Sequence, residues 1–258
     1  GSAAGLTNLG LFYLNARDFG VSPNSPDNTA ALQAAIDAAQ ARGIASVYIP
    51  SATNAYYTNA GMITLHKGME LFGGIGPFDA NGTTRIRCFG AHGIYVPNSY
   101  SVTIRGLALT GSRTNNSAGG ITVSNSVPDF PGEGVTIQDC FIRNFGWGII
   151  THSPTRVLVE NCQIDGHARA PFLLQGLIDT TRITQCTLSG ATNYFGSQTG
   201  STNPVIVTAA GSNARQVVVE NCEIGDGNPF AVINGTGNYF TFRNSNFERG
   251  ALGTNHFV

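Results

Sequence analysis

The sequence predicts an all-β protein that winds as a right-handed parallel β-helix, with three strands per coil and about 22–24 residues per coil. Three observations carry this prediction. Six similar segments recur along the chain, each alternates apolar and polar residues on both sides of a polar corner, and a small residue follows almost every corner. One helical stripe near the N-terminus predicts a capping α-helix.

The repeat is the strongest signal in the chain. The six segments occupy residues 102–109, 135–142, 157–164, 181–188, 217–224 and 240–247. Their polar corners are Gly106, Asp139, Asn161, Gln185, Asn221 and Asn244. Successive corners lie 33, 22, 24, 36 and 23 residues apart, so three intervals are one coil each and two are a coil with an insertion. Glycine and asparagine tolerate the left-handed backbone that such a corner needs.

The residue after each corner points inward. These inward residues are Leu107, Cys140, Cys162, Cys186, Cys222 and Ser245. Parallel coils stack like on like at about 4.8 Å, so small apolar cysteines can form an interior ladder. The pattern favours free thiols over disulfides, and unpaired thiols suit a protein assembled in a reducing cytosol. The five cysteines form no CxxC pair, so no zinc or other metal site is expected.

A third strand per coil is predicted at residues 93–96, 120–123, 148–151, 171–174, 204–207 and 229–232, and the last three begin with proline. Alternation along these strands places Ile150, Leu173, Ile206 and Ala231 on the outer face. An exposed apolar stripe of this kind requires a cover, which is either an insertion loop or another subunit.

The N-terminal region differs from the repeat. Residues 28–42 carry apolar residues at helical spacing, with Asp27 or Asn28 as N-cap and Gly43 as the stop. The expected buried stripe is Leu32, Ala35, Ile36 and Ala39. We expect a single domain over 1–258, in which residues 15–50 form an N-terminal strand and the capping helix. Residues 51–258 then form the coils, including a less regular early coil at 62–76 and 85–89.

Composition excludes several classes of function. Charged residues make up only 11% of the chain and the net charge is −1, which gives no reason to expect a nucleic-acid partner. No apolar run is long enough to insert in a membrane, and no cofactor is expected. Gly1 and Ser2 look like the remnant of a cleaved tag, and no C-terminal cap is evident before Val258. We therefore expect a piece of a longer chain.

Several N-terminal motifs resemble the opening of the pectate-lyase-like superfamily. They are the stretches 16–20 (ARDFG), 26–39 (PDNTAALQAAIDAA), 47–50 (VYIP), 56–57 (YY) and 68–76 (GMELFGGIG). The superfamily includes phage tailspikes and depolymerases, polygalacturonase-type hydrolases and alginate epimerases. The resemblance implies contact with a polysaccharide along a side face and, because tailspike relatives are trimers, a homotrimer through the apolar stripe.

The chain also departs from that superfamily. The usual Gly-Asp-Gly turn is replaced by residues 22–25 (SPNS), and the usual Pro-Ala-Gly by residues 50–52 (PSA). No Asp-Pro-His signature of epimerases is present, and no aspartate cluster resembles the calcium site of pectate lyases. The resemblance therefore favours hydrolysis over those two chemistries.

Carboxylates gather on the outer face of the strands that follow the corners. Asp165 and Glu223 are the predicted catalytic pair, since glycoside hydrolysis needs two carboxyl groups. We place them two coils apart, or roughly 9–10 Å, which is the upper end of an inverting gap. The predicted substrate-binding residues are His167, Arg169, Tyr194, Gln198, His152 and Gln175. Two alternatives stay open: acids on a solenoid surface are often only solvated, and the loop 126–134 with Asp129 and Glu133 is a second candidate site.

The sequence thus leads to one main hypothesis and two rivals. The main hypothesis is a phage tailspike-type depolymerase, located in the virion tail after assembly in the host cytoplasm, that binds and hydrolyses a bacterial surface polysaccharide. The rivals are a secreted polysaccharide lyase and a non-catalytic, glycan-binding or structural spike segment.

Overall fold

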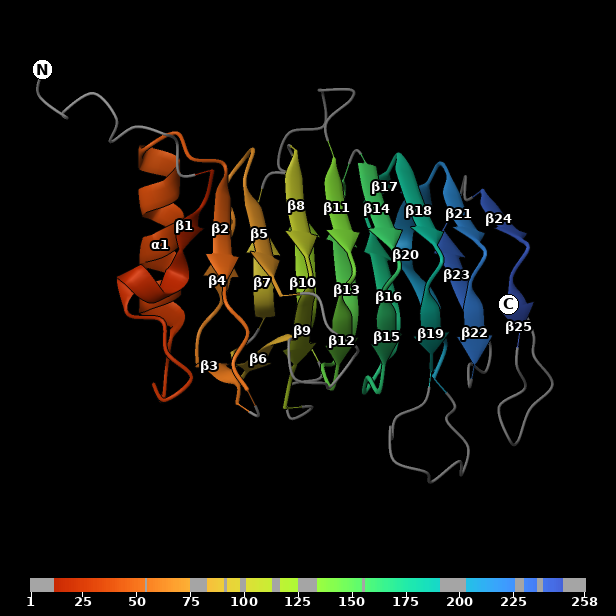
Figure 1. Ribbon diagram of the computed structural model, residues 1–258. Coiled ribbons are helices and arrows are strands. Elements are labelled where there is room, and N and C mark those ends of the chain that lie inside the picture. The colour runs from red at the N-terminus through yellow and green to blue at the C-terminus, as the bar shows by residue number, and fades with distance from the viewer. Residues whose placement is uncertain are drawn as a thin grey trace, which may run out of the picture.

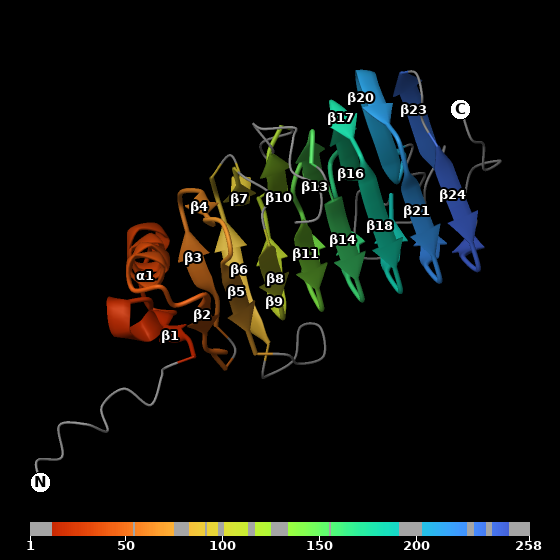
Figure 2. The ribbon, with the colours of Figure 1, turned by 90° about the horizontal axis from the view of Figure 1, so that it is seen from above.

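The computed structural model describes residues 12–53, 55–74, 83–90, 92–97, 101–112, 117–124, 134–154, 156–190, 203–225, 230–235 and 239–247. Over these residues the chain is the predicted parallel β-helix, with one α-helix at its N-terminal end (Figure 1). Every strand pairing between coils is parallel, and the strands form three sheets that run along the solenoid (Figures 1 and 2).

The first sheet holds the strands before the corners. They are β1 (Leu14–Asn15), β2 (Ser46–Ile49), β5 (Glu70–Gly73), β8 (Val102–Arg105), β11 (Val135–Gln138), β14 (Arg156–Glu160), β18 (Thr180–Thr184), β21 (Val217–Glu220) and β24 (Phe240–Arg243).

The second sheet holds the strands after the corners. They are β3 (Tyr57–Asn59), β6 (Thr84–Cys88), β9 (Leu107–Thr110), β12 (Phe141–Arg143), β15 (Gln163–Asp165), β19 (Thr187–Ser189), β22 (Glu223–Gly225) and β25 (Asn246–Phe247).

The third sheet completes each coil. Its strands are β4 (Ile63–Thr64), β7 (His92–Val96), β10 (Gly119–Ser124), β13 (Trp147–His152), β16 (Ala170–Gln175), β17 (Leu177–Ile178), β20 (Ile206–Ala214) and β23 (Ala231–Gly235).

All six predicted corners adopt the left-handed conformation. Their φ angles run from 49° at Asn161 and Asn244 to 66° at Gly106. The backbone N–H of Asn161 donates to the carbonyl of Thr184 on the next coil at 3.1 Å, and the side-chain amide of Asn161 donates to Asp139 at 2.6 Å. The corners are therefore cross-linked from coil to coil, which confirms the corner prediction.

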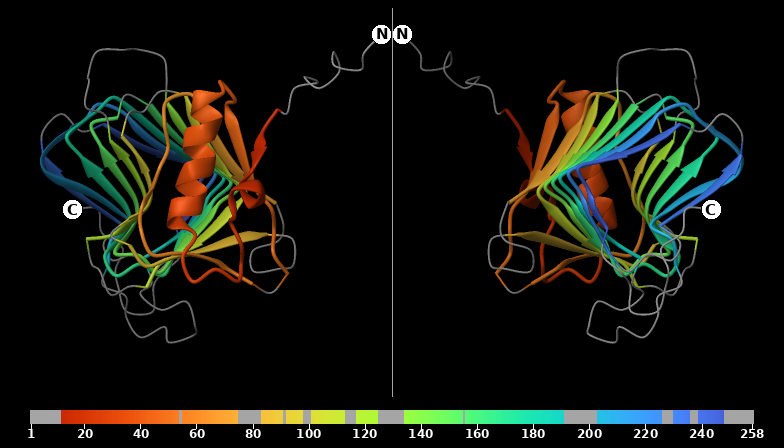
Figure 3. Two further views of the ribbon diagram at one scale, coloured as in Figure 1. Left: turned by 90° about the vertical axis from the view of Figure 1, so that its left-hand side faces the viewer. Right: turned by 90° about the vertical axis from the view of Figure 1, so that its right-hand side faces the viewer.

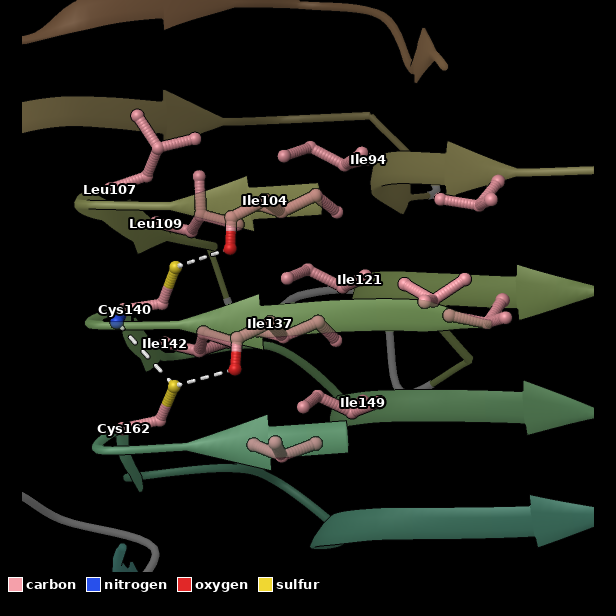
Figure 4. Packing of buried hydrophobic residues seen from close by; sticks show 14 of the residues in the cluster. Ile94, Ile104, Leu107, Leu109, Ile121, Ile137, Cys140, Ile142, Ile149 and Cys162 are labelled. Atoms are coloured by element: carbon pink, nitrogen blue, oxygen red, sulfur yellow. Dashed lines mark hydrogen bonds between the residues drawn. The ribbon is translucent and has the colours of Figure 1, made fainter. Parts of the chain in front are cut away.

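The cysteine ladder is present and its thiols are free. All five cysteines are buried without disulfides. Figure 4 shows the ladder beside stacked isoleucines: the backbone N–H of Cys140 donates to Cys162 Sγ at 3.4 Å, and that Sγ lies 3.6 Å from the carbonyl oxygen of Ile137. Burial raises the pKa of the Cys162 thiol and raises that of Cys88 to about 12. Cys88 and Cys162 are therefore packing groups rather than nucleophiles.

The predicted helix closes one end of the solenoid. Helix α1 (Thr29–Ala41) follows the short 3₁₀ helix η2 (Ala16–Phe19) and lies across the N-terminal end of the coils (Figure 3). Gly43 ends it with a φ of 67°. Its buried residues are the predicted Leu32, Ala35, Ile36 and Ala39. The helix shields the first coil from water, as a solenoid cap must.

Capping of α1 is divided between two residues. Asn28 occupies the N-cap position, but its Oδ1 accepts from the backbone N–H of Ser22 at 2.7 Å. Asp27 Oδ1 accepts from the N–H of Thr29 at 2.9 Å and from that of Ala60 at 3.0 Å. Asp27 thus satisfies a free helix N–H and ties the helix to the first coil.

The register of the third sheet corrects one prediction. Phe172 pairs with Ile206 and Leu173 with Val207, a shift of one residue from the alignment that began each strand at proline. Ile206 and Ala231 consequently point inward and are 1% and 0% exposed. Their predicted place in an outer stripe is wrong, because a one-residue slip exchanges the two faces of a strand.

Candidate active site

The outer face of the second sheet carries two rows of side chains that run parallel to the solenoid axis. We name them after one member each. The Phe141 row consists of Arg85, Ala108, Phe141, Gln163, Thr187, Glu223 and Asn246, which are successive partners in register. The Arg143 row consists of Arg87, Thr110, Arg143 and Asp165.

Part of this face is buried although it points away from the core. Phe141 is 1% exposed, Asp165 6% and Arg143 7%. The inward position between them in β12 and β15 belongs to Ile142 and Ile164, both fully buried. Charged side chains are rarely this shielded on the outside of a sheet, so the strands β12 and β15 mark a specialised patch.

Local contacts fix the buried patch. The Arg143 guanidinium lies 4.6 Å from the centre of the Phe141 ring, which is a cation–π contact. The side-chain amide of Gln163 donates to Asp165 Oδ2 at 2.7 Å. Arg143 and Asp165 are direct partners in register on β12 and β15. An aromatic ring, a guanidinium, a carboxylate and an amide thus lie side by side, the first three shielded and the amide half-buried. Groups of these kinds bind sugar rings and hydroxyls in proteins.

The predicted catalytic pair is arranged differently from the expectation. Glu223 belongs to the Phe141 row, in line with Gln163, whereas Asp165 lies two residues further along its strand. Two coils and two residues separate their Cα atoms by roughly 12 Å rather than 9–10 Å. Glu223 is exposed, but Asp165 is buried, so the expectation that both carboxylates face solvent is wrong for Asp165.

His167 and Arg169 lie in the turn after β15. His167 is 1% exposed, and its Nδ1 accepts from the backbone N–H of Phe145 at 3.4 Å. The proton therefore sits on Nε2, which donates to the carbonyl of Ile142 at 3.2 Å. This ring holds the turn together from inside, and the structure does not bring it to the outer face with Asp165. Arg169 is exposed, and its backbone N–H donates to the carbonyl of Gly146 at 2.8 Å.

The other predicted binding residues do not join this patch. His152 and Gln175 are register partners on β13 and β16, on the third sheet. His152 is exposed and Gln175 is half-buried. Tyr194 and Gln198 lie outside the described residues, and so do the alternative-site residues Asp129 and Glu133.

A cationic cluster that was not predicted from the sequence lies at the N-terminal end of the same face. Arg85 and Arg87 alternate with the buried Ile86 on β6, and both guanidiniums lie over the ring of Tyr56, at 5.0 and 4.5 Å from its centre. The alternating Arg-Ile-Arg of residues 85–87 was a visible signal for two outward cations. This signal lies outside the six repeat segments, in a coil that departs from their pattern.

The outer face of the first sheet, where the alternating polar residues predict only a solvated surface, holds a buried carboxylate. Glu220 is 5% exposed and lies between Arg182 and Arg243, whose Nε atoms donate to it at 2.5 and 2.6 Å. The hydrogen bond from Arg182, and after it the one from Arg243, holds the pKa of Glu220 below its usual value. A carboxylate locked in this way is a structural ion pair and a poor general acid.

Two further classes of site can be addressed for the described residues. They contain no group of three or more His, Cys, Asp or Glu side chains arranged to hold a metal ion. Among the same residues, no helix combines the length and the apolar character needed to cross a membrane.

Comparison with solved structures supports the fold. The catalytic unit of a GH87 α-1,3-glucanase from Streptomyces thermodiastaticus strain HF3-3 is 19% identical, with a TM-score of 0.60 over 95% of this chain. This chain spans only 42% of that unit. The A-module of the mannuronan C-5 epimerase AlgE4 from Azotobacter vinelandii is 17% identical, with a TM-score of 0.51 over 95% of this chain and 99% of the module. At these identities the likeness shows the fold alone.

Comparison with known sequences identifies the family. No curated protein sequence matches the chain. The family described as "Right handed beta helix region" matches residues 81–247, which include all six repeat segments. The chain therefore belongs to the right-handed β-helix family.

Proposed function

We propose that this chain binds a bacterial surface polysaccharide on the outer face of the second sheet, at β12 and β15. The observation that carries the proposal is the burial of Arg143 and Asp165 on an outward-facing surface, next to Phe141. Ring, guanidinium and carboxylate can together stack on a sugar and bind its hydroxyls. The family and the fold support this, since the two similar structures are named for the polysaccharides α-1,3-glucan and mannuronan.

The solenoid geometry suits a linear polymer. Neighbouring coils present equivalent positions about every 4.8 Å, so a chain lying along the Arg143 row meets a new side chain at each coil. Thr110, Arg143 and Asp165 follow one another in this row. A repeating surface of this kind binds a repeating ligand through several weak contacts.

Hydrolysis is the second candidate, and Asp165 favours it. A shielded carboxylate on a binding face is a typical position for a general acid or base. We propose Asp165 and Glu223 as the two carboxyl groups, with the long Glu223 side chain reaching along the face toward the bond to be cleaved. In this proposal the protein acts as a tailspike-type depolymerase of a virion tail. It is a homotrimer joined through the third sheet at Ile150, Leu173, Val207 and Val232.

The experiment that tests binding compares wild type with two variants on an array of bacterial glycans. Phe141→Ala removes the ring of the buried patch, and Thr187→Ala is the matched control, because Thr187 is an exposed member of the same row two coils away. We expect binding by wild type and by the control, and a loss of about tenfold or more for Phe141→Ala. Binding that is unchanged in Phe141→Ala, or an array without any bound glycan, would overturn the proposal.

The nature of the products separates the catalytic alternatives. New reducing ends without an unsaturated sugar indicate hydrolysis, whereas an ultraviolet-absorbing unsaturated product indicates a lyase. Binding without any product indicates a glycan-binding spike segment and contradicts the assignment of Asp165 as catalytic.

A further inference from the structure

The cationic cluster at β6 lies on the same face as the buried patch but nearer the capped end of the solenoid. Arg87 belongs to the Arg143 row, and Arg143 follows it after Thr110, two coils or about 10 Å away. The first carboxylate in this row is Asp165, on the next coil. Counting only residues that the structure describes, the Phe141 and Arg143 rows are positive from β6 to β12 and meet negative charge from β15 onward.

These two arginines differ from the arginines of the first sheet. On that sheet Arg105 pairs with Glu70, while Arg182 and Arg243 share Glu220. Within the part of the chain that the structure describes, Arg85 and Arg87 pair with no carboxylate and instead share the ring of Tyr56. On the first sheet these three arginines are neutralised by carboxylates of the same sheet, whereas the two arginines of β6 are not.

The environment of Arg85 points to a missing acceptor. Arg85 is 8% exposed, and its Nε and Nη2 atoms are completely shielded. Neither atom meets a hydrogen-bond acceptor among the described residues. Burying a guanidinium without an acceptor is costly, and an oxyanion that binds two of its N–H groups would remove that cost. The second guanidinium, on the exposed Arg87, lies over the same ring and can add a further contact.

We propose that Tyr56, Arg85 and Arg87 form an oxyanion-binding subsite, and that the polysaccharide bound by this chain is acidic. The acidic polysaccharide in this inference rests on the proposed function, whereas the oxyanion subsite does not depend on it. The ligand group is a carboxylate or a sulfate ester carried on a sugar. A polymer that places its anionic group on β6 continues along the Arg143 row toward Arg143 and Asp165, which joins the subsite to the buried patch.

Affinity electrophoresis tests the inference with defined polymers. Gels are cast with polygalacturonate, with dextran sulfate or with neutral dextran, and the protein is run as wild type, Phe141→Ala, Arg85→Gln, Arg87→Gln and Arg156→Gln. Arg156→Gln is the matched control, because Arg156 is an exposed arginine of β14 on the first sheet and its loss changes the charge equally. Because Arg87 is exposed, its variant keeps the fold even if Arg85→Gln does not.

We expect retardation by one of the two acidic polymers and none by dextran. The polymer that retards the protein identifies carboxylate or sulfate as the anion. Arg87→Gln should weaken retardation about tenfold, as expected for one charge-assisted contact, and Arg156→Gln should not. Equal loss in Arg87→Gln and Arg156→Gln would show only general charge attraction and overturn the inference. Retardation by dextran that Phe141→Ala abolishes and Arg87→Gln leaves intact would refute the acidic ligand while leaving the proposed function standing.

A second measurement isolates the subsite from the polymer. The ¹⁵Nε–Hε resonance of Arg85 is followed while galacturonate or inorganic sulfate is added. A saturable shift that Arg87→Gln weakens supports the subsite, even if no polymer retards the protein and the proposed function fails. An Arg85 resonance that neither anion moves contradicts the subsite.

Discussion

At the residue scale, the corners decide whether the coils can close. Asp139, Asn161, Gln185, Asn221 and Asn244 all hold positive φ angles, which cost other residues free energy. These positions were predictable because every coil needs a residue that tolerates a positive φ at its corner. Such features are predictable from a single sequence, since they depend only on the residue and its immediate neighbours in the stack.

A substitution at one corner tests this account. Asn161→Ala should lower the free energy of unfolding by about 1–2 kcal/mol, because alanine tolerates a positive φ poorly. It also removes the hydrogen bond to Asp139. Asn161→Gly is the matched control: it loses the same hydrogen bond but relieves the backbone, and should cost less. Chemical denaturation measures both, and equal losses would contradict the role assigned to φ.

The cysteine ladder provides a second residue-scale prediction. All five thiols are buried, and burial raises the pKa of Cys88 to about 12. We expect no reaction of the native protein with a thiol reagent at neutral pH and reaction of all five cysteines in denaturant. Rapid labelling of Cys140, Cys162, Cys186 or Cys222 in the native state would show that the ladder is open to water.

At the element scale, the alternation of strands was predictable but their mutual register was not. Segments that follow a corner were aligned correctly, because the corner anchors them. The third strands have no such anchor, and alignment on their prolines displaced Ile206 by one residue from its core position. Within the second sheet the outward face of Asp165 was correct, but its expected distance from Glu223 was too short. That distance counted coils alone, although Asp165 lies four residues after its corner and Glu223 only two.

The ion pairs on the first sheet give an element-scale prediction about pH. The pKa of Glu220 is lowered by Arg182 and Arg243, so the unfolded chain binds a proton more readily than the folded one. The stabilisation by Glu220 is therefore complete above the ordinary pKa of a glutamate and is lost as the pH falls through the lowered value. Glu220→Gln should be less stable than wild type at neutral pH.

The difference between the two proteins should shrink as the medium becomes acidic, in melting curves recorded across that range. A difference that is constant with pH would show that Glu220 contributes through packing alone. Glu160→Gln is a suitable control, because Glu160 lies two coils away in the same row of the first sheet.

At the scale of the whole molecule, the family and the fold followed from the repeat, whereas the site depends on how separate coils combine. The burial of Asp165 and Arg143 could not be anticipated from alternation, which places both simply outside. Tyr56 and Arg85 come together only through the pairing of β3 with β6. Contacts between side chains of different coils cannot be predicted from the repeat pattern alone.

The corrected register changes the test of assembly. Val207→Asp, on the outer face beside Leu173, should convert a homotrimer to a soluble monomer in light scattering, because it places a charge in the proposed contact. Ile206→Asp is the contrasting variant: it buries an unpaired charge in the core and should unfold the chain instead. A trimer that survives Val207→Asp, or a wild-type monomer, would contradict the proposed contact.

Catalysis by the buried patch can be tested with variants of its two carboxylates. On a confirmed substrate, Asp165→Asn should lower turnover about a hundredfold or more, as expected for the loss of general acid–base help. Glu223→Gln should do the same, whereas Glu160→Gln on the first sheet should leave turnover unchanged. Full activity in Asp165→Asn would move the catalytic site away from β15.

The most direct test of the account is a crystal structure of the protein with an oligosaccharide from the polymer that retards it in affinity electrophoresis. The account predicts a sugar on the outer face of the second sheet, stacked near Phe141, with its hydroxyls within hydrogen-bond distance of Arg143 or Asp165. An oligosaccharide bound only to the first or third sheet, with the β12 and β15 face unoccupied, would contradict it.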